Sequence, residues 1–328
     1  MFTQAYEQMR DIDLGALRPS QPGGTAPHIS FEIYFKNEDV EGMGGPYRQF
    51  FSDIAQELQV VQSKSINDDD EDKEEGEAEN NNEAQAGDAE DGKQYIGLLC
   101  ASKNMLRGSD KGKDKFTLNP SKSGSNELSL FNFLGVLMGV CIRTSTNLSI
   151  NLPSLFWKQL VGQRLAYEDI EELDDGIIEQ LREMLECADE EEFTHKFTDR
   201  YFTVELSDST EVELVEGGAK KELTFANRVD YVRKALYSRL TESVRQCEAI
   251  KAGINQVIPE ALLNIVSSSE LEEWIFGKKF IDIELLKRHT KYSNGYVEGD
   301  KEIRWFWEIL HEFSQEERRK FIRFCYAQ

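Results

Sequence analysis

The chain has 328 residues, of which 39% are hydrophobic, and a formal net charge of −23. This length and apolar content are enough to bury a core, as one large domain or two, so the chain is neither a peptide nor a tail. Nucleic acid is excluded as the main partner, because phosphate binding needs clustered Lys and Arg and the sequence has no such stripe.

The amino-terminal residues 1–28 are predicted to be a lead-in, because proline and glycine between residues 19 and 27 interrupt any long element. Residues 1–10 carry Gln, Glu and Arg where a secretory signal needs an apolar segment, so no export is predicted and a cytoplasmic location is expected. Residues 29–35 alternate apolar and polar side chains as a half-buried strand does. The glycines at 42–45 lack the Lys-Ser/Thr of a phosphate-binding loop and are predicted to turn into a helix over 47–58.

Residues 63–93 are predicted to be a disordered acidic insertion. Between residues 68 and 91 the sequence has 13 Asp or Glu and one Lys, and no aromatic residue. Such a segment cannot bury enough apolar surface to offset the entropy lost on ordering. Two roles remain open, a solvated surface loop and an acidic motif that binds a partner.

The remainder is predicted to be an α+β, helix-rich fold. Apolar residues three and four apart predict helices over 153–160, 177–187, 228–246, 259–265, 270–276 and 281–287. Short strands are predicted over 95–100, 116–120, 202–206, 211–215 and 221–224, with a turn at Gly217 and Gly218.

The most apolar segment, residues 128–142, can be a buried helix or a membrane helix whose Gly135 and Gly139 form a packing face. It is shorter than the roughly 20 residues that a bilayer requires, and polar residues interrupt or bound it. A buried helix, and no membrane span, is therefore predicted.

No metal or cofactor site is predicted. The five cysteines, Cys100, Cys141, Cys187, Cys247 and Cys325, form no CxxC pair, and the four histidines are scattered. Cys325 lies near Arg319 and Lys320, and nearby cations favour a reactive thiolate. However, a capping box at Ser314 and Glu317 starts a helix that places Cys325 on an apolar face, so a structural role in a core is predicted.

Several blocks of sequence, in the same order, resemble the HECT-type ubiquitin ligases, most closely the large HERC-type members. They are residues 41–51, with a Gly-Gly turn before Arg-x-Phe-Phe, and residues 133–139, 152–162, 224–232, 291–296 and 302–318. Together they extend over most of the chain from residue 29 onward. The resemblance implies a ubiquitin transferase that docks a ubiquitin-conjugating enzyme carrying ubiquitin and relays the ubiquitin as a thioester to substrate lysines.

The resemblance also implies a domain plan. Residues 29–298 correspond to the N-lobe, with a conjugating-enzyme-binding subdomain at about 163–227. Residues 299–328 correspond to a hinge, with Gly299 as the flexible residue, and to the first helices of a truncated C-lobe. The nucleophilic cysteine is expected beyond Gln328, so no catalytic residue is assigned within the chain, which is expected to be inactive alone.

By position, the residues of the family's docking groove correspond in this sequence to an apolar stripe on one helix and to one aromatic residue of the following helix. These residues are Ile177, Leu181, Met184, Cys187 and Tyr231. An aromatic residue is usual in the family where Cys187 stands, and Phe is common where Tyr231 stands. Two alternatives remain open: the stripe can pack inside the domain, as helical apolar stripes commonly do, and the chain can be a non-catalytic module that binds or sequesters conjugating enzymes.

Overall fold

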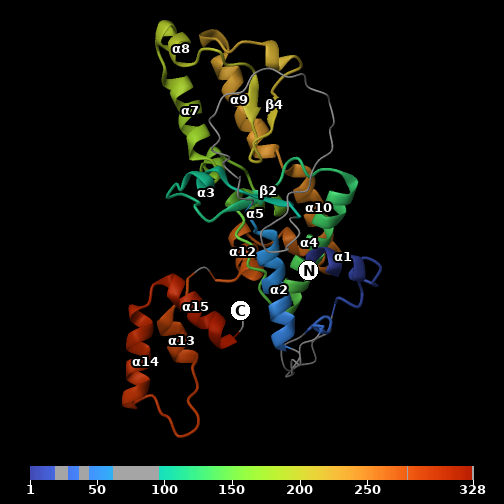
Figure 1. Cartoon of the computed structure of the whole chain (residues 1–328), viewed down its shortest axis with the longest axis vertical. Coiled ribbons are helices and arrows are strands. Elements are labelled where there is room, and N and C mark those ends of the chain that lie inside the picture. Colours follow the sequence, from blue (N-terminus) through green and yellow to red (C-terminus); the bar gives the residue numbers. More distant parts are fainter. Residues whose placement is uncertain (19–28, 37–43, 62–95, 279, 327–328) are drawn as a thin grey trace, which may run out of the picture.

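The computed structural model describes residues 1–18, 29–36, 44–61, 96–278 and 280–326, without the side chains of 323 and 326. The predicted acidic insertion, 63–93, lies outside the described residues, as do residues 42 and 43 of the glycine turn. Buried apolar side chains of the described residues form three separate clusters. Figure 1 shows the corresponding parts, which we call the scaffold, the small subdomain and the C-terminal unit.

The scaffold is mostly helical. Its helices are α1 (Phe2–Met9), α2 (Gly44–Leu58), α3 (Lys103–Arg107), α4 (Ser125–Thr144), α5 (Ser154–Leu160), α6 (Tyr167–Glu171), α10 (Val244–Val257), α11 (Glu260–Leu263) and α12 (Ser268–Phe276). Its strands β1 (Leu99–Ala101) and β2 (Phe116–Leu118) pair antiparallel, with Cys100 opposite Thr117. Both strands and the helices at α5 and α12 confirm predicted elements.

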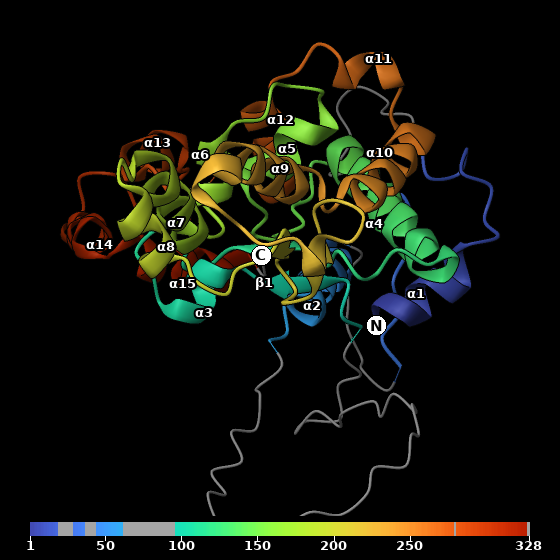
Figure 2. The same cartoon turned by 90° about the horizontal axis from the view of Figure 1, so that it is seen from above.

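The helices α4 and α10 lie side by side at the centre of the scaffold (Figure 1 and Figure 2). Glycines allow their backbones to approach closely: a Cβ added to Gly253 would lie 1.9 Å from the carbonyl oxygen of Asn132, and one added to Gly135 would lie 2.0 Å from that of Ile250. With 20 residues, α4 is longer than predicted and is long and apolar enough to cross a membrane. Most of its apolar side chains are buried in this core, and Leu128, Leu130 and Ile142 are partly buried against it.

The amino-terminal region differs from its prediction. The lead-in contains helix α1, whose Phe2 is fully buried and packs 5.4 Å from the Phe133 ring. Residues 29–36 form no strand in the described structure. Phe31 instead packs against α2, with 5.1 Å between its ring and that of Tyr47. Aromatic packing against α2 thus holds this segment in place, although none of its described residues pairs as a strand.

The small subdomain contains residues 175–241. Its elements are α7 (Asp175–Glu186), α8 (Glu190–Lys196), β3 (Thr203–Glu205), β4 (Glu211–Glu213), the 3-10 turns η1 (Gly218–Lys220) and η2 (Phe225–Asn227), and α9 (Arg228–Thr241). The predicted strands at 202–206 and 211–215 are confirmed as β3 and β4, which pair antiparallel as a hairpin. Gly217 has a positive φ of 70° at the predicted turn after β4. The predicted strand at 221–224 is not formed, and only an isolated bridge joins Tyr201 to Glu222. The turn η2 begins directly after Thr224, so the chain does not continue as a strand.

The predicted helix over 228–246 is two helices. It breaks after Thr241, where the side chain of Glu242 accepts hydrogen bonds from Arg239 and Ser207. The hydroxyl of Ser243 then donates to the carbonyl of Leu118 in β2, at 3.3 Å. These contacts join the end of α9 to the scaffold and redirect the chain into α10.

The C-terminal unit consists of α13 (Ile283–His289), α14 (Lys301–Glu312) and α15 (Gln315–Tyr326). Ile283, Trp307 and Leu310 form its buried cluster, and the Trp307 indole donates to the hydroxyl of Tyr292 at 2.9 Å. Helix α13, which precedes residue 299, thus packs with α14 and α15, and the boundary at residue 299 stays a prediction. Gly299 lies in a turn before α14 with no atom within 4 Å of an added Cβ, and its role as a hinge stays a prediction.

Candidate functional site

Helix α7 presents the predicted stripe, and its local sequence explains why it starts where it does. The Asp174 side chain caps the helix by accepting from the backbone N–H of Ile177, at 3.2 Å. Residues 177, 181 and 184 are spaced four and three apart, so they lie on one side of the helix. The helix ends at Cys187, whose backbone is extended.

The structure brings the five predicted docking residues into one place, but it buries three of them. Leu181, Met184 and Tyr231 belong to the buried cluster of the small subdomain, whereas Ile177 and Cys187 are half-buried at its edge. Most of the stripe therefore packs inside the subdomain. Only its edge residues are exposed to a partner in this conformation.

Tyr231 is held in place from two sides. Its hydroxyl donates to the carbonyl oxygen of Thr203 in β3 at 3.0 Å, and its ring lies edge-on to Phe202 with centroids 5.5 Å apart. Burial raises the pKa of the Tyr231 phenol, so the ring stays neutral and serves as a packing group. The family commonly has phenylalanine at this position. Tyrosine fits here because its hydroxyl has a hydrogen-bond acceptor, the carbonyl oxygen of Thr203.

A cleft of about 650 Å³ opens beside this cluster, between the first turns of α7 and the β3–β4 hairpin. Ile177, Val204, Tyr201 and Tyr231 give it an apolar part. Its rim is charged and polar, with Lys103, Arg107, Asp174, Gln180, Asp199, Arg200, Glu205 and Glu211 among the lining residues. An apolar side chain ringed by polar groups on a partner would match this surface.

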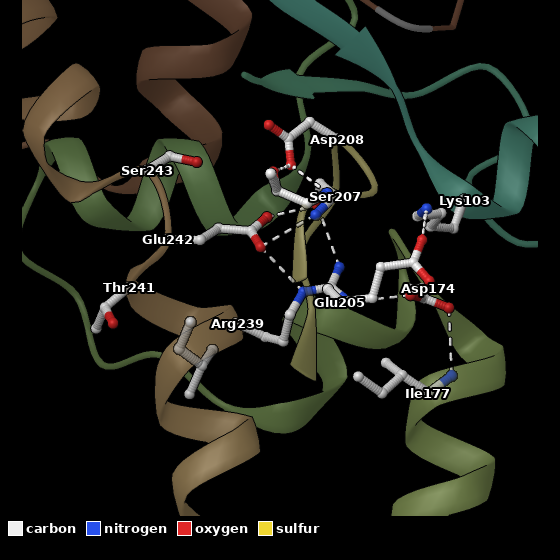
Figure 3. A network of polar contacts seen from close by, with 12 residues as sticks. Lys103, Asp174, Ile177, Glu205, Ser207, Asp208, Arg239, Thr241, Glu242 and Ser243 are labelled. Carbon is white, nitrogen blue, oxygen red and sulfur yellow. Dashed lines mark hydrogen bonds and ion pairs between the residues drawn. The ribbon is translucent and has the colours of Figure 1, made fainter. Parts of the chain in front are cut away.

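A buried polar network lies at the base of the cleft (Figure 3). The side chain of Arg239 is 2% exposed and contacts Asp174 and Glu242, each at 3.0 Å. It also donates to the carbonyl oxygen of Glu205 at 3.2 Å and to the hydroxyl of Ser207 at 3.1 Å. Burial raises the pKa of the Glu242 carboxyl, and Arg239 offsets part of that rise.

Two further cations reach the network from α3. Arg107 contacts Asp174 at 2.7 Å, and Lys103 binds the carboxylate of Glu205. The hydrogen bond from Lys103 lowers the pKa of Glu205, against a smaller opposing effect of burial. The network therefore joins α3 of the scaffold to both α7 and β3 of the small subdomain.

The cysteines occupy unlike environments. Cys141 and Cys247 are buried and Cys100 is half-buried, and burial raises the pKa of Cys100 and of Cys247 to about 12. Cys325 is exposed, so the prediction that it faces a core is wrong. In α15, Phe321 packs on Phe306 with centroids 5.8 Å apart, whereas Phe324 is 88% exposed.

No cluster of three or more potential metal ligands occurs among the described residues. The sequence analysis did not identify the side chains that surround the stripe, namely Arg239, Lys103 and the cleft residue Tyr201. A lone arginine on a helix is usually solvent-exposed, so nothing in the local pattern pointed to a buried one. The only available signal was the paired acidic residues at 174 and 175, which start α7.

Known proteins resemble the chain over most of its length. A sequence model described as HECT-domain (ubiquitin-transferase) matches residues 96–327. The chain is 30% identical over 304 residues to the E3 ubiquitin-protein ligase HERC2 of Mus musculus, which covers 92% of the chain and 6% of that protein. It is 30% identical over 348 residues to the probable E3 ubiquitin-protein ligase HECTD4 of Homo sapiens, covering 100% of the chain and 8% of that protein. The chain thus spans less than a tenth of the length of these relatives.

Proposed function

Because the chain belongs to the HECT-domain (ubiquitin-transferase) family, we propose that its small subdomain docks a ubiquitin-conjugating enzyme carrying ubiquitin. In the relay that the family implies, a ligase thiolate attacks the thioester carbonyl, the thiolate of the conjugating enzyme leaves, and a substrate lysine then takes the ubiquitin. Docking is the contribution we assign to these 328 residues.

The cleft beside α7 is the observation that carries this proposal. Two residues expected at the docking groove, Ile177 and Tyr231, line it from two different helices. The buried Leu181 and Met184 support the cleft from inside the subdomain. We therefore assign contact with the partner to Ile177, Tyr201 and the rim, and assign the deeper part of the stripe to the shape of the cleft.

The test is a titration of isotope-labelled conjugating enzymes with the whole chain, followed by amide chemical shifts. We expect shifts on one face of the conjugating enzyme. Ile177→Ser should weaken binding about tenfold, because it removes an apolar contact at the centre of the site. Leu185→Ala is the matched control, since Leu185 is 47% exposed on the same helix but does not line the cleft. A folded chain that shifts no enzyme in a broad panel would contradict the proposal.

We further propose that these 328 residues accept no ubiquitin thioester themselves. Cys141 and Cys247 are buried, and burial raises the pKa of Cys100 to about 12. Neither Cys187 nor Cys325 lines the cleft where the charged enzyme would dock. A reaction with activating enzyme, conjugating enzyme and ubiquitin should therefore leave no adduct that a thiol reductant removes, and an adduct mapped to Cys325 would overturn this expectation.

A further inference from the structure

We propose that Arg239 is a positioning residue for docking, one that sets the spacing between the two walls of the cleft; this rests on the docking function proposed above and deepens it. One wall is the start of α7, whose lining residues include Asp174 and Ile177. The other is strand β3, whose lining residues include Val204 and Glu205. Arg239 does not line the cleft itself but lies at its base (Figure 3).

A single nitrogen of Arg239 reaches both walls. Its Nη1 donates to Asp174 Oδ2 at 3.0 Å and to the backbone carbonyl oxygen of Glu205 at 3.2 Å. Because both acceptors share one nitrogen, the walls cannot move apart here without breaking one of these two hydrogen bonds. The cleft is thus tied across its base.

The position of that nitrogen is itself fixed. Nε lies 3.0 Å from Glu242 Oε2, and Nη2 donates to the hydroxyl of Ser207 at 3.1 Å. A guanidinium is planar and its N–H groups have fixed directions, so these contacts determine where Nη1 lies. The side chain of Arg239 is 2% exposed, so water has little access to its donors.

Asp174 passes this constraint to the docking residue Ile177. While Oδ2 binds Arg239, Oδ1 accepts from the backbone N–H of Ile177 at 3.2 Å and caps α7. A shift of the carboxylate would therefore move or uncap the first turn of the helix. Arg239 thus acts on Ile177 through Asp174, and it acts on β3 directly.

Tyr231 and Arg239 lie eight residues apart, and so on one side of α9. The Tyr231 hydroxyl donates to the carbonyl oxygen of Thr203 at 3.0 Å, two residues before the carbonyl that Arg239 binds. Helix α9 therefore holds β3 at two points. The hydrogen bond of Tyr231 ends at β3, whereas those of Arg239 continue to the start of α7, so Arg239 is the residue that relates one wall to the other.

Apolar packing supports the same walls. Leu181 of α7 and Val204 of β3 belong to one buried cluster, and Ile178 is buried where α7 meets α6. From α3, Lys103 and Arg107 each bind one wall. Apolar contacts stabilise without fixing direction. We therefore assign the stability of the walls to this packing, and their spacing at the base of the cleft to the guanidinium.

Arg239→Lys tests the proposal in the full chain, because lysine keeps the positive charge beside the buried carboxylates but lacks the planar fork. Residual dipolar couplings measure the orientation of α7 relative to the β3–β4 hairpin. One alignment tensor should fit the amides of both elements in the wild type. In the variant, each element should keep its own pattern of couplings while the two require different tensors. Titration with a labelled conjugating enzyme should show an affinity lowered about tenfold, because the two walls no longer face the partner together.

Arg233→Lys is the matched control, since Arg233 lies on the same helix, its side chain is 77% exposed, and it pairs with Asp230 at 2.6 Å. This control should keep one tensor and the wild-type affinity. A folded Arg239→Lys chain with a single tensor, or with the wild-type affinity, would overturn the proposal.

If Arg239→Lys does not fold, the double variant Arg239→Met with Glu242→Gln takes its place. It removes both charges of the Arg239–Glu242 pair together. Asp174 keeps its contact with Arg107 at 2.7 Å, so no buried carboxylate is left without a partner. The same divergence of the two tensors is expected, and a single tensor would again overturn the positioning role.

The two measurements separate the role of Arg239 from the docking function. If the wild-type chain binds no conjugating enzyme, the docking function fails, whereas the tensors still report whether Arg239 spaces the walls. If the wild type binds and the folded variant retains one tensor, docking stands and the positioning role fails.

Discussion

The helix pair α4–α10 in the scaffold and the pair α7–α9 in the small subdomain are built on different principles. The first pair is apolar along its contact and is brought close by Gly135, Gly139 and Gly253. The second buries one face of each helix around Met184 and Tyr231 and leaves the other faces to solvent. The scaffold is held by packing over a large core. The small subdomain has a small core of its own, and polar contacts from Lys103 and Arg107 of α3 also reach it.

Apolar packing and polar contacts constrain the arrangement of a protein in different ways. Apolar burial stabilises without fixing direction, so a large core is needed to make packing specify one arrangement. Hydrogen-bonded ion pairs fix direction but add little net stability, because burying the charges offsets much of their attraction. A subdomain held by such contacts can keep one orientation while its core remains separate.

The largest expected effect tests the close contact of α4 and α10. Gly253→Val should destabilise the protein by more than about 3 kcal/mol, because its Cβ would overlap the backbone of Asn132. Chemical denaturation measures this cost. Gly45→Ala is the control: no atom lies within 4 Å of an added Cβ in α2, so that variant should be neutral or slightly more stable. Equal stability of the two variants would refute close α4–α10 packing.

The next effect should be confined to the small subdomain. Tyr231→Ala removes a buried ring and should cost about 3 kcal/mol, whereas Tyr231→Phe loses only the hydrogen bond to Thr203, about 1 kcal/mol. Hydrogen exchange should show α7 and α9 losing protection in Tyr231→Ala while α4 and α10 keep theirs. Loss of protection in both regions would mean that the two cores unfold as one. Because Tyr231→Ala perturbs folding, Ile177→Ser is the better probe of docking.

The rate at which cysteines are alkylated should also differ between the scaffold and the small subdomain. Cys247 of α10 is buried with its pKa raised to about 12, whereas Cys187 at the end of α7 is half-exposed. At about pH 8 only roughly one Cys247 thiol in 10,000 is ionised, and the thiolate is the reactive form. Iodoacetamide on the native chain, read by mass spectrometry, should modify Cys187 and Cys325 well before Cys247. Similar rates at all three sites would show that the scaffold core opens readily.

The smallest effect concerns the hairpin contact at Asp208. Burial raises the pKa of this carboxyl while hydrogen bonds from Ser121 and Thr210 lower it, and the net shift is downward. A carboxyl with a lowered pKa stabilises the fold above its unfolded pKa of about 4, and this contribution is lost as the pH falls through the folded pKa. The difference in Tm between wild type and Asp208→Asn should therefore shrink between about pH 6 and about pH 3. A constant difference would show that the charge of Asp208 contributes nothing.

The sequence alone determined the helix-rich class, the strands β1 to β4 and most helices from α5 to α13, because apolar spacing and turn residues act locally. It also determined the family, which the match over residues 96–327 confirms. Local pattern could not place α1 in the core, divide residues 228–246 into α9 and α10, or show that Cys325 is exposed. Each of these depends on which distant segment packs against the residue.

For the candidate site too, the sequence predicted some features and only the tertiary structure decided others. Helical spacing put Ile177, Leu181 and Met184 on one face, but only the tertiary structure decided that the face turns inward and that the cleft lies at its edge. Arg239 is the clearest case, since its partner Asp174 lies 65 residues away in the sequence. A buried charge is stable only where the fold supplies opposite charges and hydrogen bonds around it, and no local pattern specifies that arrangement.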